Sequence, residues 1–320
     1  MTEGYTVGVD VGGTSTRALV LRLDGMVLGR GESGGANPNS HPPAVAAARV
    51  AEAIAAAFGE RNPGAARHCV QGLAGVSKLS DPAVGAEFDD ALAGIGVRCP
   101  VTNVSDAEVA FASATGEPDG TVLVAGTGSV AARIAGRRRT TVAGGHGWLL
   151  GDEGSAFWIG REAVRATLHA LRSQAGVGAL ASAVLAEALP GPPDTEPGWQ
   201  ERGYARLITA ANAEPPIRLA RFARLVSAHA ATDPQAKEIV QAAATILMEL
   251  LHAVRSPAER TPIVLIGSVA GAGTPVGEAL RAALAAQSGG PVLPAADGAS
   301  GAAWLAAIEV LGPDAPRPRV

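Results

Sequence analysis

The stretch 7–16 combines an apolar strand, one carboxylate and a turn rich in glycine and hydroxyl groups. β-Branched residues alternate as far as Val11 and a second apolar run begins at Thr16, so the pattern predicts a β-hairpin. Its turn is formed by Gly12, Gly13, Thr14, Ser15 and Thr16. The backbone N–H groups of such a turn can point at one phosphate, and the hydroxyls add donors. Asp10 is unsuited to a bare phosphate but suits a hydrated Mg²⁺ beside one, which favours a phosphate loop over a hairpin that merely requires glycine.

The same strand–turn–strand pattern returns over residues 121–135, where VLVAGTGSVAARIA can be aligned with GVDVGGTSTRALVL. The second copy keeps the glycines and hydroxyls, at Gly126, Thr127 and Gly128, but has no aspartate. Two such hairpins suggest two related domains that face one nucleotide, with a single metal carboxylate. A third glycine loop, Gly267-Ser268, follows an apolar strand, where the backbone of an α/β fold can approach an adenine or ribose.

Several acidic and imidazole side chains lie near these loops, each with a structural alternative. Asp106 begins a predicted helix between the two hairpins, where it would either cap the helix or accept the proton of a substrate hydroxyl during phosphoryl transfer. The helix dipole should keep it ionised. Asp152 would cap a helix or bind sugar hydroxyls, and His146 would contact a ligand or lie in a solvated loop. Glu108 would be a supporting or surface group, or would face a cationic substrate group.

Composition excludes several other classes of protein. The net charge of −4 gives no general attraction to nucleic acid or an anionic membrane, and no uncharged apolar run reaches membrane-spanning length. The two cysteines, Cys69 and Cys99, lack the spacing of a zinc or iron–sulfur site and disfavour a disulfide scaffold. The first strand starts almost at once, which leaves no room for a signal peptide, so we expect a cytoplasmic protein.

The elements that must position these residues follow from the same patterns. A β-meander near the N-terminus is followed by βαβα units, which predicts an α/β domain, and the plan restarts at residue 121. Helices then dominate to residue 254, before a strand at 262–266 and a last helix at 298–311. We expect residues 313–320 to form a frayed tail.

Taken in order, the motifs resemble the actin, hexokinase and heat-shock chaperone superfamily of ATP-binding proteins. More specifically, they resemble its N-acetylglucosamine kinase and bacterial glucosamine kinase branch, related to the BadF/BadG/BcrA/BcrD ATPases, and the resemblance covers nearly the whole chain. The matching segments are DVGGTST at 10–16, the Asn37 loop, GLAGVS at 72–77, NVSDA at 103–107, AGTGS at 125–129, AGGHGWLLGDEGS at 143–155 and IGSV at 266–269. The segment GDEGSA at 151–156 is the most diagnostic.

The resemblance implies an α/β, duplicated ribonuclease H-like (actin-like ATPase) fold, with two lobes and a nucleotide and sugar cleft. Residues 1–115, completed by a helix at about 304–320, would form the N-terminal lobe, and residues 116–303 the C-terminal lobe. The resemblance assigns ATP phosphates to both glycine hairpins, the nucleoside to Gly267 and Ser268, water-mediated Mg²⁺ to Asp10, and the general base toward a sugar 6-hydroxyl to Asp106. The residues that it implies for the sugar pocket are Asn37, Ser77, Asn103, Gly145 and Asp152, and Glu108, Thr127 and His146 are further candidates on the substrate side.

The substrate is therefore expected to be an aminohexose, phosphorylated by ATP. An additional carboxylate at Glu108 could attract an ammonium group, which favours D-glucosamine, with N-acetylglucosamine as the alternative. A non-catalytic ATP clamp and a cluster-bearing activator ATPase are more distant alternatives, and the resemblance leaves a homodimer open.

Overall fold

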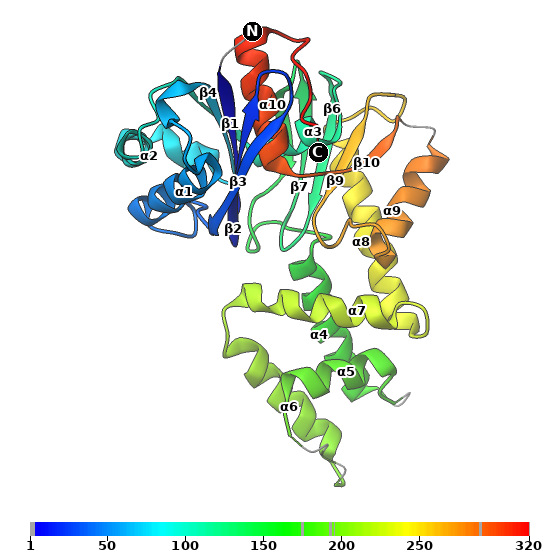
Figure 1. The fold of residues 1–320 in the computed structure, drawn as a ribbon. Helices are drawn as coiled ribbons and strands as arrows, with labels where there is room; N and C mark the ends of the chain where they lie inside the picture. The colour runs from blue at the N-terminus through cyan, green and yellow to red at the C-terminus, as the bar shows by residue number, and fades with distance from the viewer. Residues whose placement is uncertain (1–3, 174–175, 192–193, 195, 288–289, 320) are drawn as a thin grey trace. The chain divides into compact units, whose positions relative to one another are not determined.

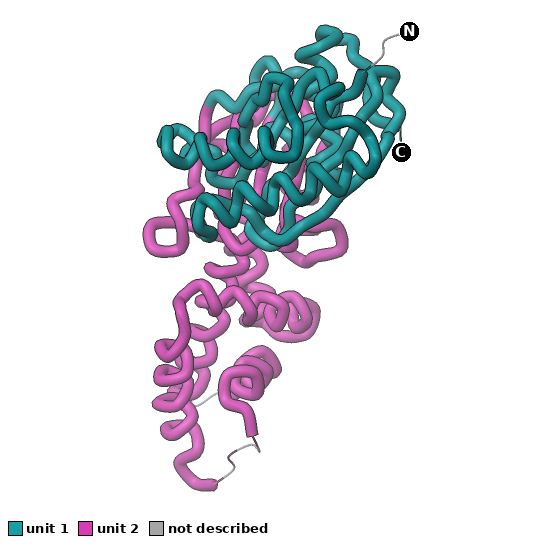
Figure 2. The backbone as a smooth tube through the Cα atoms, turned by 60° about the vertical axis from the view of Figure 1, so that its left-hand side comes forward, with its two compact units in different colours: residues 1–120, 134–140, 295–320 teal, residues 121–133, 141–294 magenta. Residues whose placement is uncertain are grey.

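The computed structural model describes residues 4–173, 176–191, 194, 196–287 and 290–319. The chain divides into two compact units, each built around one β-sheet (Figures 1 and 2). The first unit comprises residues 1–120, 134–140 and 295–320, and the second comprises residues 121–133 and 141–294. No helix among the described residues is both long enough and apolar enough to cross a membrane.

The sheet of the first unit has the strand order β3-β2-β1-β4-β5. Its strands are β1 (Tyr5–Val11), β2 (Ser15–Arg22), β3 (Val27–Gly34), β4 (Ala66–Leu73) and β5 (Val101–Ser105). The pairs β1–β2 and β2–β3 are antiparallel, whereas β4 lies parallel to both β1 and β5. The structure therefore confirms the predicted meander followed by parallel strands.

Helices cover both faces of this sheet. They are α1 (Pro43–Phe58), α2 (Pro82–Gly94), α3 (Asp106–Ala114) and α10 (Gly298–Leu311), with short 3-10 helices η1 (Pro63–Ala65) and η2 (Val76–Ser80). Apolar residues of α1 and α2 pack with Val7, Val9 and Val11, and residues of α3 and α10 pack on the opposite face. Helix α10 approaches β1 closely, because a β-carbon added to Gly8 would lie 2.0 Å from the backbone nitrogen of Ala303.

The C-terminal segment is ordered by contacts within the first unit. Trp304 Nε1 donates a hydrogen bond to the Ala315 carbonyl, and the Arg317 guanidinium lies 4.4 Å from the Trp304 ring centre. Arg317 also donates to the Ala112 carbonyl, and the Arg319 N–H donates to the Gly25 carbonyl. Our expectation of a frayed tail is therefore wrong for residues 313–319.

A second sheet, most of whose residues belong to the second unit, repeats the order of the first. Its order is β10-β9-β6-β7-β8, which from the other edge is a meander of β6, β7 and β8 flanked by β9 and β10. The strands are β6 (Gly120–Ala125), β7 (Ser129–Ala135), β8 (Arg138–Gly144), β9 (Ile263–Ile266) and β10 (Val292–Pro294). The duplicated α/β plan predicted from the two hairpins is thus present.

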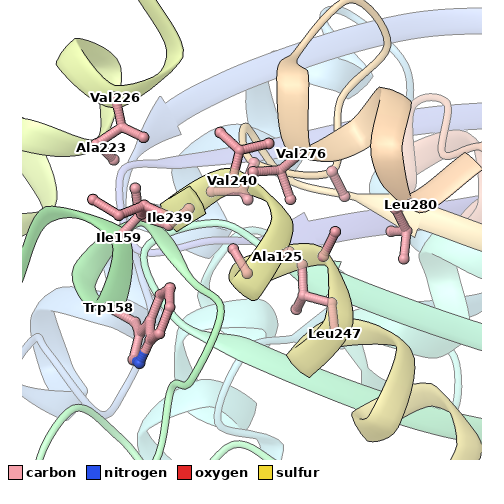
Figure 3. Packing of buried hydrophobic residues seen from close by; sticks show 14 of the residues in the cluster. Ala125, Trp158, Ile159, Ala223, Val226, Ile239, Val240, Leu247, Val276 and Leu280 are labelled. Atoms are coloured by element: carbon pink, nitrogen blue, oxygen red, sulfur yellow. The ribbon is translucent and has the colours of Figure 1, made fainter. Parts of the chain in front are cut away.

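The second unit is richer in helix than the first. The elements are α4 (Ala156–Arg172), α5 (Ala179–Ala188), α6 (Trp199–Asn212), η3 (Pro216–Phe222), α7 (Ala223–His229), α8 (Pro234–His252) and α9 (Pro275–Ala286). One apolar core joins α4, α7, α8 and α9 to the end of β6 at Ala125 (Figure 3). This core fixes the N-terminus of α4 and the end of β6, and the second glycine turn follows β6 and contacts the start of α4.

Candidate functional site

The glycine turn of the first unit connects β1 to β2. The Gly12 N–H donates to the Ser15 carbonyl at 3.0 Å, which closes the turn, and Gly13 and Thr14 are exposed at its tip. No atom would lie within 4 Å of a β-carbon at Gly13. Thr16, by contrast, is buried, and its hydroxyl donates to the Gly34 carbonyl at 2.9 Å. Our expectation that the Thr16 hydroxyl faces a phosphate is therefore wrong, whereas Gly13 and Thr14 have the exposure that a phosphate loop needs.

The loop that follows β3 packs against this turn. The N–H groups of Ala36 and Asn37 both donate to the Gly12 carbonyl, and Arg49 of α1 donates to the Gly35 carbonyl. The Asn37 Oδ1 atom accepts a hydrogen bond from the Asn39 N–H at 2.8 Å, an Asx turn that fixes its side chain. The candidate sugar residue Asn37 is thus attached to the candidate phosphate turn by backbone hydrogen bonds.

Asp10 lies at the end of β1, against the start of α10. A β-carbon added to Gly298 would lie 2.5 Å from Asp10 Oδ2, so the helix can approach the carboxylate only because residue 298 is glycine. Burial raises the pKa of Asp10 to about 6, with further increases from the charges of Asp106 and Asp297, while Arg17 acts in the opposite direction. Three carboxylates therefore share one region of the first unit.

Asp106 is the first residue of α3, and one of its carboxylate oxygens accepts the Ala107 N–H at 2.9 Å. Burial raises the pKa of Asp106 above its usual value, against the lowering effects of the Ala107 hydrogen bond and of Arg139. Desolvation therefore has a larger effect on the pKa of Asp106 than the lowering groups around it, and the expectation that Asp106 is ionised stays a prediction. The cap of α3 is Ser105, so capping does not account for Asp106.

Glu108 has a structural partner instead of an exposed position. Its Oε2 atom accepts hydrogen bonds from the Ser105 N–H at 2.7 Å and from the Ser105 hydroxyl at 2.6 Å. This is a capping box, and it leaves Glu108 only 8% exposed. The structure thus contradicts our expectation that Glu108 presents a free carboxylate to a cationic substrate group.

The remaining candidates of the first unit, Ser77 and Asn103, are both exposed. Ser77 lies in η2, directly after β4, and Asn103 lies on the neighbouring strand β5. Strand β4 is held tightly, because a β-carbon at Gly72 would lie 2.3 Å from Val109 of α3. Ser77 therefore follows β4, and Asn103 lies on β5, the strand next to it in the same sheet.

In the second unit, the glycine turn between β6 and β7 is attached to the start of α4. The Gly126 N–H donates to the Gly128 carbonyl, and the N–H groups of Ala156 and Phe157 donate to the carbonyls of Gly126 and Thr127. Gly267 packs against the same strand end, since a β-carbon there would lie 2.4 Å from the Ala125 carbonyl oxygen. The second unit thus brings Gly126 and Gly267, from two of the predicted nucleotide loops, to one place.

Asp152 also contacts this turn. Its Oδ1 atom accepts the Ser129 N–H at 3.1 Å, and its backbone has a φ of +58°, which is uncommon for a residue other than glycine. Ser155, and not Asp152, caps α4, which removes the capping alternative. Gly145 donates its N–H to the Ser129 carbonyl, and His146 is exposed beside Gly151. Asp152 and Gly145 are therefore joined through Ser129.

A comparison with known families identifies the chain. The model of the BadF/BadG/BcrA/BcrD ATPase family matches residues 7–306, which include every candidate residue described above. The chain belongs to the BadF/BadG/BcrA/BcrD ATPase family.

Two curated relatives of this family member are sugar kinases by name. The chain is 29% identical over 167 residues to the N-acetylmuramic acid/N-acetylglucosamine kinase of Clostridium acetobutylicum, a match that covers 51% of this chain and 53% of that protein. It is 28% identical over 189 residues to the N-acetyl-D-glucosamine kinase of Dictyostelium discoideum, covering 56% and 57% of the two chains. The chain thus spans about half the length of the curated relatives that it matches.

Solved structures extend the similarity to most of the fold. A Chromobacterium violaceum protein described as a candidate N-acetylglucosamine kinase has a TM-score of 0.73 and 25% identity, and the match covers 94% of this chain and 98% of that one. A glucokinase from Streptomyces griseus, in complex with glucose and AMPPNP, has a TM-score of 0.54 at 19% identity, covering 95% and 99%. This second likeness concerns the fold alone.

Sequence reasoning missed three residues of the chain that organise the candidate site. Asp297 caps α10 through the Ala299 N–H and is paired with Arg30, and Gly298 contacts Asp10. Ser129 joins Asp152 to Gly145. The only signal for Asp297-Gly298 was a helix-cap pattern, which does not indicate that the helix starts beside Asp10.

The residues around Asp10 fit a hydrated Mg²⁺. Magnesium is commonly held by one or two carboxylates together with water and substrate phosphates. The described residues contain no group of three or more acidic, histidine or cysteine side chains arranged to enclose a metal. Asp10 instead offers one carboxylate, whose pKa is raised by burial and by the charges of Asp106 and Asp297, and a bound cation would stabilise its ionised form.

Proposed function

We propose that this ATPase-family member transfers the γ-phosphoryl group of ATP to the 6-hydroxyl of an aminohexose, with N-acetylglucosamine as the preferred substrate. The observation that carries the proposal is the position of Asp106, which is the first residue of α3 and not its N-cap. Its carboxylate lies close enough to Asp10 to raise the pKa of Asp10, at the end of the strand that enters the glycine turn. A base beside a phosphate loop is what phosphoryl transfer to an alcohol requires.

Asp106 would act as the general base in this reaction. Its carboxylate accepts the proton of the 6-hydroxyl as the sugar oxygen forms a bond to the γ-phosphorus. The bond between that phosphorus and the β–γ bridging oxygen breaks, and ADP leaves with the electron pair. A raised pKa favours this role, because a more basic carboxylate accepts a proton more readily at the pH of the cell.

Phosphate binding is proposed for the turn residues of each unit, namely Gly12, Gly13 and Thr14 in the first and Gly126, Thr127 and Gly128 in the second. Mg²⁺, held through water near Asp10, would neutralise charge on the β- and γ-phosphates. Gly267 and Ser268 would approach the nucleoside. That both turns bind the same ATP stays a prediction.

The preference for the N-acetyl form reverses the sequence-based preference for glucosamine. That preference depended on a free carboxylate at Glu108, whose Oε2 atom instead accepts two hydrogen bonds from Ser105. The names of the curated relatives from Clostridium acetobutylicum and Dictyostelium discoideum support the N-acetylated substrate. We propose sugar contacts for Asn37, Ser77 and Asn103 of the first unit. That Gly145 and Asp152 of the second unit bind the same sugar stays a prediction.

The test is ADP release by the purified chain, measured with Mg²⁺ and ATP across N-acetylglucosamine, glucosamine, glucose and mannose. We expect the highest kcat/KM with N-acetylglucosamine and the 6-phosphate as the product. Higher kcat/KM with glucosamine would overturn the substrate preference alone. No sugar-dependent ADP release would overturn the kinase and favour a non-catalytic ATP clamp.

A further inference from the structure

A polar side chain is buried without a partner in the first unit. Gln71 of β4 is only 1% exposed, and its Oε1 atom has no hydrogen-bond partner among the described residues. A buried acceptor left without a donor destabilises the folded state, because its lost hydration is not compensated. Packing alone does not account for glutamine at this position, where leucine would bury apolar surface without that cost.

The surroundings of Gln71 are apolar on its own strand. Cys69 and Leu73, two residues to either side, belong to the core that also contains Val9, the register partner of Gln71 on β1. Because side chains alternate along a strand, Gln71 points to this same face of the sheet. Neither neighbour on β4 offers an oxygen or nitrogen side chain.

The strand on the other side of β4, β5, places a polar residue beside Gln71. Asn103 of β5 is the register partner of Gln71, and Val101, two residues before it, packs on the same core. Asn103 therefore shares the face of Gln71, on a strand about 4.8 Å away, but is exposed at the end of the row. An asparagine amide can donate through Nδ2 and accept through Oδ1 at the same time.

We infer that Gln71 is a positioning residue that orients Asn103 toward the sugar, an inference that rests on the proposed function. The Asn103 Nδ2 group donates to Gln71 Oε1 when the sugar binds, and this fixes Asn103 Oδ1 to accept a sugar hydroxyl. The buried oxygen then gains its missing donor only in the complex. Gln71 thus contributes to sugar affinity without touching the sugar.

A positioning role for Gln71 should affect the sugar KM without affecting the ATP KM or the stability of the fold. In Gln71→Leu we expect the sugar KM to rise about fivefold to tenfold, as for one lost hydrogen bond of ordinary strength, and the ATP KM to stay within twofold. The unfolding temperature should not fall, because the unpaired acceptor has been removed. If Gln71 had no such role, the same substitution would leave the unfolding temperature no lower but would give no selective change in the sugar KM.

The experiment measures steady-state kinetics and thermal unfolding of the full chain with four variants: Gln71→Leu, Asn103→Ala, their double variant, and the control Cys69→Ala on the same face of β4. We expect the double variant to have the sugar KM of Asn103→Ala alone, within twofold, because Gln71 acts through Asn103. The control should lower stability and leave both KM values within twofold.

Three results would overturn the inference: an unchanged sugar KM in Gln71→Leu, equal changes in both KM values, or independent effects that multiply in the double variant. If Gln71→Leu does not fold, Gln71→Met removes the same acceptor with a more flexible side chain and is held to the same outcomes. Failure of the proposed function is distinct, because the unmodified protein would then release no ADP with any aminohexose.

Discussion

The carbonyl oxygen of Gly12 accepts a hydrogen bond from the backbone N–H of Asn37 at 3.2 Å, which joins the candidate phosphate turn to the candidate sugar loop within one unit. Ala36 donates to the same oxygen at 3.0 Å. A shift of either segment would therefore disturb the other. In the proposed kinase, these backbone hydrogen bonds would fix the position of the sugar hydroxyl relative to the phosphate before reaction.

Substitution of Gly35 tests the contact between the loop after β3 and the glycine turn. A β-carbon at residue 35 would lie 2.0 Å from the Gly13 carbonyl oxygen, so Gly35→Ala must push the loop and the turn apart. Overpacking of this kind costs about 1–3 kcal/mol, and we expect kcat/KM for both sugar and ATP to fall about tenfold or more. Gly94→Ala is the matched control, because nothing lies within 4 Å of its added β-carbon. A loss confined to one substrate would contradict the coupling.

Gly13 tests the phosphate turn itself. A β-carbon at Gly13 meets no protein atom within 4 Å, so Gly13→Ala should leave the unfolding temperature unchanged. The methyl group would instead project where a phosphate is expected to bind, and the KM for ATP should rise about tenfold, the cost of one lost phosphate contact. The sugar KM should stay within twofold. An unchanged ATP KM would mean that this turn does not hold phosphate.

Glu108 tests the role of the capping box. Glutamine can replace glutamate in this motif, so Glu108→Gln should keep both the fold and the ratio of KM values for glucosamine and N-acetylglucosamine. Glu108→Ala should lower stability by about 1 kcal/mol, typical of a lost helix cap, in a urea titration. If Glu108→Gln raised the KM of glucosamine alone, the carboxylate would recognise an ammonium group after all.

The elements that local pattern determines were predictable from the sequence. Alternating valines before Gly12 and a second apolar run after it determine the β1–β2 hairpin, and the recurrence around Gly126 revealed the duplicated sheet. Each of these hairpins is formed by residues that are close in the sequence, so hydrophobic periodicity and turn-forming residues are enough to predict it.

The missed features depend on contacts that the sequence order conceals. Gly298 meets Asp10 although 288 positions separate them, and no local pattern reports that approach. Hydroxyls and carboxylates were also assigned to ligands before internal partners were known, as with Thr16 and the Gly34 carbonyl. The sequence therefore predicted which side chains could bind a ligand, but not which of them already form hydrogen bonds within the protein.

The raised pKa of Asp106 predicts a pH dependence of kcat. Because the group is an acid whose pKa lies above its usual value of about 3.9, it is protonated at a pH where an ordinary aspartate is still ionised. Activity should therefore fall with decreasing pH, starting above the range of an exposed aspartate. An acid limb centred at or below pH 4 would mean that a different group controls turnover.

The most direct test of the account is the turnover number and ATP affinity of Asp106→Asn, compared with the unmodified protein. Loss of a general base should lower kcat about 10²- to 10⁴-fold, while the Kd of Mg-ATP, measured by calorimetry, stays within threefold. Asparagine preserves the size of the side chain and its acceptor oxygen for the Ala107 N–H, so the start of α3 should remain intact. A kcat within tenfold of the unmodified protein would contradict the assignment of Asp106 as the base and, with it, the proposed mechanism.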